Sequence, residues 1–333
     1  MWFHPNTTLS TGSRYLGAAE MAAAYQDADL WGPALARCDV IGTYVDPARE
    51  TSTGTDGFLV GLVKMANLYR KDIAIEAAGP YGTAGYPTGA ASATRDLTTS
   101  IANIVALGGT VGWISMDHPI QRVIDGLGQT EAQAVAQVVA YMQTIHATYP
   151  AIKIGLIDQP TNWEYGGLGR YAAGSYGHNY DTVFTALMVA IAAAGETLGF
   201  LHVDIPYEYA NGIVSSSQSG ADHWLTRVKT MQTVAASYAV PFGVVINSAY
   251  GGGGEGTGTF PGAPFAGSDA LFGKYTLLFA ENLRRRIAAG SLAALDHVLI
   301  QSWFYYPRDL APDTTAYTFC DTFLRAKAVF NTA

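Results

Sequence analysis

Acidic side chains close four consecutive apolar segments of the chain, and carboxylates in such positions can carry out acid–base chemistry. They are Glu76, Asp117, Asp158 and Asp204. A lone aspartate after a strand usually forms a turn or caps a helix. Four in matching positions are harder to explain in that way, since we expect the helices that follow them to begin ten or more residues later. Like charges gathered at one place would raise the pKa of some of these groups, as acid–base catalysis requires.

A fifth carboxylate, Glu208, follows Asp204 by four residues within the segment GFLHVDIPYEY, residues 199–209. A helix would place both acids on one face, but the β-branched residues around Asp204 favour a strand and Pro206 disfavours a helix interior. We therefore expect Asp204 to close a strand. Glu208 should lie beyond it in the wall of the site, as a substrate contact or a supporting group before a catalyst.

The elements that must position these groups repeat along the chain. Each unit is a short apolar run, a loop rich in Gly, Pro or Tyr, and a segment with apolar residues at helical spacing. The apolar runs are residues 2–6, 39–46, 72–79, 110–119, 152–160, 199–206, 242–250 and 297–307. Eight alternations of strand and helix are typical of parallel strands covered by helices. The sequence therefore predicts an α/β fold, a single (β/α)8 TIM barrel over residues 1–333, with long loops after strands 5 and 7.

Helical signals between these runs support the same fold. Thr130 and Gln133 have the spacing of a capping box, and several segments carry apolar residues on one helical face. These residues are Leu97, Ile101, Ile104 and Val105; Val135, Val138, Val139, Met142 and Ile145; Val183, Leu187, Met188 and Ile191; and Phe319, Phe323 and Val329 in a last helix over 314–330. An open doubly wound sheet is disfavoured, because no GxGxxG or Walker sequence occurs and the glycines at 251–254 lead into a loop.

Polar and aromatic residues accompany the carboxylates at the predicted strand ends, where the active sites of such barrels lie. Aromatic rings in polar loops offer flat faces to the C–H side of sugars, and hydroxyl, amide and imidazole groups can bind sugar hydroxyls. We expect a carbohydrate partner. The candidate substrate-binding residues are His4, Tyr44, His118, Trp163, Tyr207, Asn247, Tyr250, Gln301 and Trp303.

With its strand-end carboxylates, aromatic loops and Trp303 after the eighth strand, the whole chain resembles the TIM-barrel glycoside hydrolases. It departs from their best-known clan, which ends strand four with Asn-Glu and strand seven with Glu, where this chain has Asp117-His118-Pro119 and Asn247-Ser248. Barrels that use aspartates on strands four and six match Asp117 and Asp204 better.

The resemblance implies hydrolysis of a poly- or oligosaccharide by two carboxyl groups, one protonated as the acid and one ionised as the nucleophile or base, without a cofactor or metal. We expect Asp117 to be the nucleophile or base and Asp204 the acid. Glu76, Asp158 and Glu208 are the other catalytic candidates.

Two other functions use the same residues. Glu76, Asp117 and Asp158 could be the Mg²⁺ ligands of an enolase-like lyase or isomerase, although the strand ends lack the lysine base of such enzymes, since Lys71 and Lys153 lie near strand beginnings. A catalytically inactive, carbohydrate-binding barrel is the second alternative, but a binding site has no need for several mutually repelling acids. A serine hydrolase is disfavoured because no Gly-x-Ser-x-Gly occurs.

Composition narrows the possible partners and compartment. The net charge is −8 and the largest basic cluster is Arg284–Arg286, which argues against a nucleic-acid partner. No apolar run approaches the roughly 20 residues of a membrane span.

The two cysteines, Cys38 and Cys320, are expected to be buried thiols, with a single bridge as the minor alternative. Scarce charge and abundant Tyr and Gly suggest a secreted or periplasmic protein whose leader is absent from this chain, with a cytoplasmic protein as the alternative. The pattern does not indicate an oligomeric state.

Overall fold

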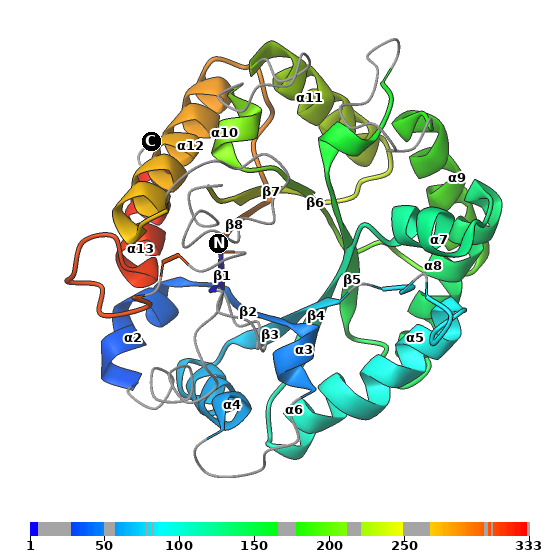
Figure 1. Ribbon diagram of the computed structural model, residues 1–333, viewed down its shortest axis with the longest axis horizontal. Coiled ribbons are helices and arrows are strands. Elements are labelled where there is room, and N and C mark those ends of the chain that lie inside the picture. The colour runs from blue at the N-terminus through cyan, green and yellow to red at the C-terminus, as the bar shows by residue number, and fades with distance from the viewer. Residues whose placement is uncertain are drawn as a thin grey trace.

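Eight parallel strands close into a barrel in the computed structural model of the protein (Figure 1). The structure describes residues 1–5, 28–49, 57–77, 79–81, 83–165, 178–211, 221–248, 267–302, 306–307 and 309–331. The strands are β1 (Trp2–His4), β2 (Val40–Tyr44), β3 (Asp72–Ala77), β4 (Val111–Asp117), β5 (Lys153–Asp158), β6 (Leu201–Asp204), β7 (Phe242–Ile246) and β8 (His297–Gln301). Each pairs with the next, and β8 closes the barrel on β1. The predicted α/β barrel is confirmed, and every strand lies inside its predicted apolar run.

Helices form a ring outside the strands (Figure 1). They are α2 (Ala28–Arg37), α3 (Val45–Ala48), α4 (Phe58–Tyr69), α5 (Gly89–Asp96), α6 (Ala102–Ala106), α7 (Pro119–Leu127), α8 (Glu131–His146), α9 (Tyr180–Ala193), α10 (Tyr207–Ala210), α11 (Ala221–Ser237), α12 (Asp269–Ala288) and α13 (Phe319–Asn331). A π-helical turn, η1 (Leu97–Ile101), lies between α5 and α6, and a 3-10 turn, η2 (Pro160–Asn162), follows β5. None of these helices, within the described ranges, is long and apolar enough to cross a membrane.

The predicted helix signals are largely borne out. Thr130 and Gln133 form the expected capping box at the start of α8. Val105 is a correction, because it is predicted on the buried face of its helix and is 42% exposed. The π-helical turn η1 adds a residue to one turn and so rotates the residues after it out of the simple helical spacing. The last helix begins at Phe319 and not at residue 314.

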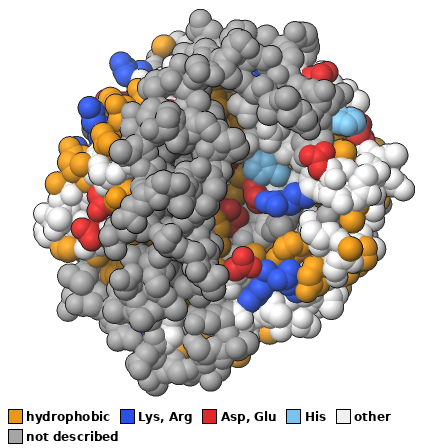
Figure 2. Space-filling model, viewed as in Figure 1, with side chains coloured by type: hydrophobic (Ala, Val, Ile, Leu, Met, Phe, Trp, Pro, Cys, Tyr) orange, Lys and Arg blue, Asp and Glu red, His pale blue; other side chains and the backbone are white. Residues whose placement is uncertain are grey.

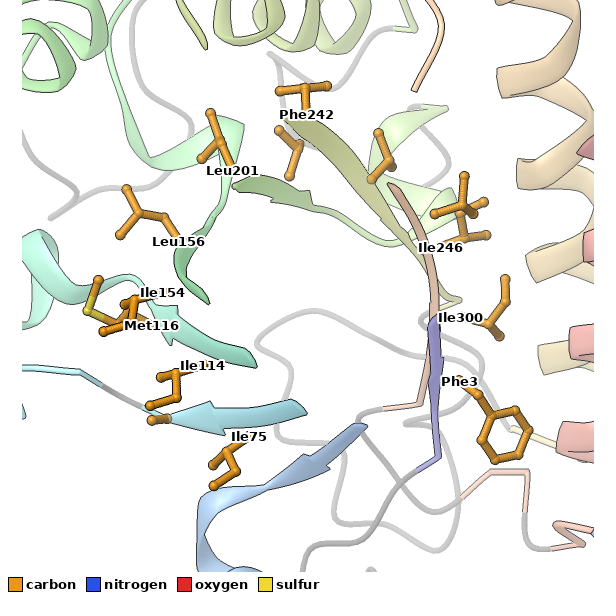
Figure 3. Close-up of a cluster of buried hydrophobic side chains, with 14 of the residues drawn as sticks. Phe3, Ile75, Ile114, Met116, Ile154, Leu156, Leu201, Phe242, Ile246 and Ile300 are labelled. Carbon is orange, nitrogen blue, oxygen red and sulfur yellow. The ribbon is translucent and has the colours of Figure 1, made fainter. Parts of the chain in front are cut away.

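Alternate residues of each strand face opposite sides of the barrel wall. One set packs between the strands and the helices; those labelled in Figure 3 are Phe3, Ile75, Ile114, Met116, Ile154, Leu156, Leu201, Phe242, Ile246 and Ile300. A separate buried cluster lines the inside of the barrel and consists of Trp2, Val40, Ala74, Phe200, Val245 and Leu299, with Trp113 packed against it. Because side chains alternate with a period of two, these sets fix which side each strand's last residue faces.

Glycine at position 155 is required by close packing inside the barrel, where a Cβ would overlap the ring of Phe200. We expect Gly155→Ala to lower the free energy of unfolding by about 1–3 kcal/mol through overpacking, measured by urea denaturation. Gly85→Ala is the matched control, because a Cβ there meets no atom within 4 Å. Equal stabilities of the two variants would contradict this account of the barrel interior.

Cys38 and Cys320 are both buried and both free thiols, as predicted. Burial raises the pKa of Cys38 to about 12. Both side chains belong to the apolar core and not to the carboxylate-rich end of the barrel.

Candidate active site

The carboxyl ends of the strands bring most of the predicted site residues to one end of the barrel. Strand alternation continues the inward-facing set to these residues: His4, Tyr44, Glu76, Asp117, Asp204, Asn247 and Gln301. They come from seven of the eight strands or the residue directly after a strand. Figure 2 shows acidic, basic and imidazole side chains gathered in a hollow near the centre of one face. The arrangement is that of a barrel active site.

Glu76 is held by residues from three other strands. Gln301 Nε2 donates to Glu76 Oε2 and, at 3.1 Å, to the Tyr44 hydroxyl, and that hydroxyl donates to the Ser302 carbonyl at 2.9 Å. His4 Nδ1 lies 3.7 Å from Glu76 Oε2. Burial lowers the pKa of His4 to about 3, so this imidazole is neutral at neutral pH. Glu76 therefore has a fixed position without a cationic partner among these contacts.

Asp117, in contrast to Glu76, contacts a cationic side chain. His118 Nδ1 contacts Asp117 Oδ1, and Arg122 Nη2 donates to Asp117 Oδ2, while Arg122 Nε donates to the Asp117 carbonyl at 2.7 Å. Burial favours the protonated acid, but the charges and hydrogen bonds of His118 and Arg122 outweigh it and hold the pKa of Asp117 well below its usual range. Asp117 is an ionised carboxylate.

The start of α7 differs from the prediction, and it explains why His118 and Arg122 both contact the Asp117 carboxylate. We call these two contacts the clamp on Asp117. The sequence predicts the helix ten or more residues after Asp117, yet it begins at Pro119. His118 adopts a left-handed conformation with φ of 49°, and the fixed φ of Pro119 suits the first helical position. The immediate turn brings Arg122, in the first turns of the helix, back onto Asp117. Sequence reasoning missed Arg122, although Pro119 in the motif was a signal for a helix start.

Glu76 and Asp204 share a site that favours their protonated forms. Burial raises the pKa of Glu76 to about 8, and the negative charge of Asp117 adds to the rise. Burial also raises the pKa of Asp204 well above its usual range, with further contributions from Glu76 and Asp117. Among the described residues of the barrel mouth, the surroundings therefore favour the ionised form of Asp117 and the protonated forms of Glu76 and Asp204.

Several buried polar atoms at this mouth have no hydrogen-bond partner in the part of the chain that the structure describes. They are Asp204 Oδ1, Gln301 Oε1, His4 Nε2 and both amide atoms of Asn247. A buried polar group without a partner costs about 1–3 kcal/mol, and native proteins contain few of them. Such a concentration of donors and acceptors suits a polar ligand with many hydroxyl groups.

Asp158 faces away from this group. In the pairing of β4 with β5, the partner of Asp117 is Ile157, so Asp158 points to the other side of the barrel wall. Its carboxyl group is buried, and its charge acts on Tyr165 and on Tyr180 of α9. Burial raises the pKa of Asp158 to about 7. The expectation that all four strand-end acids converge is therefore wrong for Asp158.

Glu208 and Tyr207 lie in α10, directly after β6. Glu208 is predicted in the wall of the site as a substrate contact or a supporting group. Its residue is 0% exposed and its carboxylate accepts a hydrogen bond from Ser248 Oγ at 2.6 Å, which fits the supporting group and not the substrate contact. This hydrogen bond connects the segment that follows β6 to the segment that follows β7. The Tyr207 ring packs on α12, with its centroid 5.4 Å from that of Tyr275.

Trp163 also departs from its expected place. The sequence predicts that it offers its ring to a sugar, but it is 1% exposed and packs edge-to-face on Tyr180, with 5.5 Å between ring centroids. Arg227 Nη1 of α11 donates to the Trp163 carbonyl at 2.8 Å, and this hydrogen bond connects the backbone after η2 to α11. Tyr250 and Trp303, also predicted to bind substrate, lie outside the described residues.

The described residues contain no group of three or more His, Cys, Asp or Glu side chains arranged to hold a metal ion. The three carboxylates considered as Mg²⁺ ligands illustrate the reason. Glu76 and Asp117 face the inside of the barrel, whereas Asp158 faces the helices. These three residues therefore do not form the predicted ligand set.

The solved structures to which this chain is similar are remote from it in sequence. No family model and no curated protein matches the sequence. An endo-beta-1,3-glucanase from Amycolatopsis mediterranei, solved with laminaritriose, is 13% identical, with 98% of this chain and 99% of that chain covered and a TM-score of 0.44. A glucosidase from Croceicoccus marinus is 10% identical, with a TM-score of 0.47; the match covers 91% of this chain and only 63% of the glucosidase. Malate synthase from Haloferax volcanii, in a lead(II) complex, is 9% identical and covers 100% of this chain and 73% of that chain, with a TM-score of 0.49. Likenesses at this level carry no argument about activity.

Proposed function

We propose that the protein is a glycoside hydrolase that cleaves a poly- or oligosaccharide, with Asp204 as the general acid and Asp117 as the nucleophile or base. One observation carries the proposal: two inward-facing carboxyl groups at the barrel mouth have surroundings that shift their pKa values in opposite directions, down for Asp117 and up for Asp204. Glycosidic cleavage requires such a pair, because one group must give a proton to the leaving oxygen while the other supplies negative charge or activates water.

The contacts support a separate part for each residue in this proposal. The Asp204 carboxylic acid donates its proton to the glycosidic oxygen, and the Asp117 carboxylate, fixed by His118 and Arg122, attacks the anomeric carbon or removes a proton from the attacking water. Glu76 stays protonated at neutral pH, and above its own pKa its negative charge raises the pKa of Asp204 further. The amide atoms of Asn247 and the side-chain oxygen of Gln301, which have no hydrogen-bond partner among the described residues, supply donors and acceptors for sugar hydroxyls.

Incubation with a panel of α- and β-linked oligosaccharides, followed by chromatography of the products, tests the proposal. We expect shorter saccharides from at least one substrate class. The anomeric form of the first product, followed by NMR, then distinguishes a nucleophilic Asp117 from a basic one, because retention requires carboxyl groups about 5–5.5 Å apart and inversion about 6.5–9.5 Å. Saturable binding without cleavage across the panel would indicate an inactive, carbohydrate-binding barrel instead.

Metal removal separates the proposed hydrolase from an enolase-like enzyme. Since Glu76, Asp117 and Asp158 do not face one point, we expect the same rate of saccharide cleavage before and after treatment with EDTA. The measurement is the initial rate after dialysis, with and without added Mg²⁺ or Mn²⁺. A loss of activity that either ion restores would contradict the metal-free mechanism.

A further inference from the structure

Asp158 is a buried acid that the proposed mechanism does not use. It closes β5 and is 4% exposed, but it faces the helices and cannot approach a substrate held among the inward-facing residues. Burial disfavours its ionised form, His118 and the side chain of Trp163 favour that form, and Asp117 opposes it. The charge of Asp158 in turn acts on the rings of Tyr165 and Tyr180. A carboxyl group in such surroundings is costly, which raises the question of what it does there.

His118 links Asp158 to the mouth of the barrel. The His118 backbone N–H donates to the carbonyl of Ile157, the residue before Asp158, at 3.0 Å. Its left-handed backbone conformation turns the ring so that Nδ1 contacts Asp117. The other ring nitrogen, Nε2, is buried and has no hydrogen-bond partner among the described residues. The His118 ring therefore contacts an inward-facing carboxylate on β4, while its backbone is bonded to the residue that precedes the outward-facing carboxylate on β5.

The charged groups that act on His118 come from three elements. Burial disfavours the imidazolium, Asp117 of β4 and Asp158 of β5 favour it, and Arg122 of α7 opposes it. The net effect raises the pKa of His118. A buried imidazolium whose Nε2–H lacks a partner among the described residues needs compensating negative charge nearby, and Asp158 is a second carboxylate, besides Asp117, whose charge favours it.

We infer that Asp158 is a positioning residue: from the outer side of the barrel wall, its carboxylate holds His118 as the imidazolium that fixes the Asp117 carboxylate. Asp158 acts through His118 and does not touch the substrate. The kinetic part of this inference rests on the proposed function, whereas the coupling between Asp158 and His118 does not. Because the pKa of Asp158 is about 7, its support for the imidazolium grows as the pH rises through neutrality.

The test is Asp158→Asn, which keeps the shape of the side chain and removes its charge. We expect the titration midpoint of the His118 ring, followed by NMR of its nitrogens, to fall by roughly 1 pH unit. With a cleavable saccharide, kcat above pH 7 should fall by roughly tenfold, with KM little changed. Asp181→Asn is the control, because Asp181 also acts on Tyr165 and Tyr180 but not on His118. An unchanged His118 midpoint in Asp158→Asn would overturn the inference.

A second measurement covers the case in which Asp158→Asn does not fold. In a protein with intact Asp158 and Glu76→Gln, which removes the neighbouring titration, the His118 nitrogen shifts should show an inflection near pH 7 from Asp158. A single smooth titration without that inflection would also overturn the inference. A shifted His118 midpoint in a protein that cleaves no saccharide would support the coupling and refute only the proposed function.

Discussion

Asparagine in place of Asp117 is expected to lower kcat for saccharide cleavage by roughly 10³-fold or more, and Asp204→Asn by roughly 10²–10⁴-fold, the range typical of a lost general acid. Neither amide can replace the acid, because the amide at position 117 carries no charge and the amide at position 204 has no carboxylic proton to give. Both amides keep the volume of the original side chain, so the barrel should remain folded. Steady-state kinetics and circular dichroism on the same samples measure both outcomes.

The two variants should differ in how their activity responds to the substrate. Without its acid, Asp204→Asn should lose least on aryl glycosides, whose leaving groups need little protonation, and most on natural saccharides. Asp117→Asn should lose activity on both. In Asp117→Gly, which removes the side chain and leaves space, a small anion such as azide should restore turnover of aryl glycosides if Asp117 is the nucleophile.

Asp46→Asn is the matched control for these kinetics. Asp46 also lies at the end of the barrel where the strands terminate, in α3, but its side chain is 64% exposed and pairs with Arg49. Its replacement should leave kcat within a factor of about two, since exposed ion pairs contribute little. Near-normal turnover in Asp117→Asn or Asp204→Asn would remove that residue from the catalytic pair.

The barrel could be predicted from the sequence because both sides of a parallel strand are buried, so its strands stand out as continuous apolar runs. Because both sides of such a strand are apolar, the sequence does not show which side of the barrel wall the strand's last residue faces. Asp117, Asp158 and Asp204 look alike as the polar ends of such runs, yet Asp158 faces outward. Counting in steps of two from Lys153 would have separated them, since Lys153, Gly155 and Ile157 form the inward-facing series of β5.

Other features of the site depend on contacts that no local pattern encodes. Trp163 lies in a polar segment, as a sugar-binding ring would, but Arg227, from a helix more than sixty residues later, holds its backbone against the outer layer. The clamp on Asp117 required a helix that begins directly after the strand, through the left-handed His118 and Pro119. The opposite protonation states of Asp117 and Asp204 follow from this tertiary arrangement, so the sequence could suggest the pair but not assign its charges.

The largest expected effect on stability comes from Glu76. Its pKa in the folded protein is about 8, raised from an ordinary value of 4.5, so the folded state binds this proton more tightly than the unfolded state does. The resulting stabilisation is complete below pH 4.5 and is lost as the pH rises through 8. At about 1.4 kcal/mol per pKa unit, and allowing for partial solvent exposure and for coupling to Asp117, the loss amounts to roughly 2–4 kcal/mol.

Glu76→Gln should therefore be more stable than the natural protein at pH 9, by roughly 2–4 kcal/mol, and close to it at pH 4. The glutamine can still accept the hydrogen bond from Gln301 Nε2 and carries no charge to bury. Urea denaturation at the two pH values measures the difference, with the exposed Glu281→Gln on α12 as the control. The same shift of stability at both pH values would show that Glu76 is not protonated in the folded state at neutral pH. Asp204 would then face the negative charge of Glu76, which raises the pKa of Asp204 further, so the acid role of Asp204 would stand and only the neutral state assigned to Glu76 would fail.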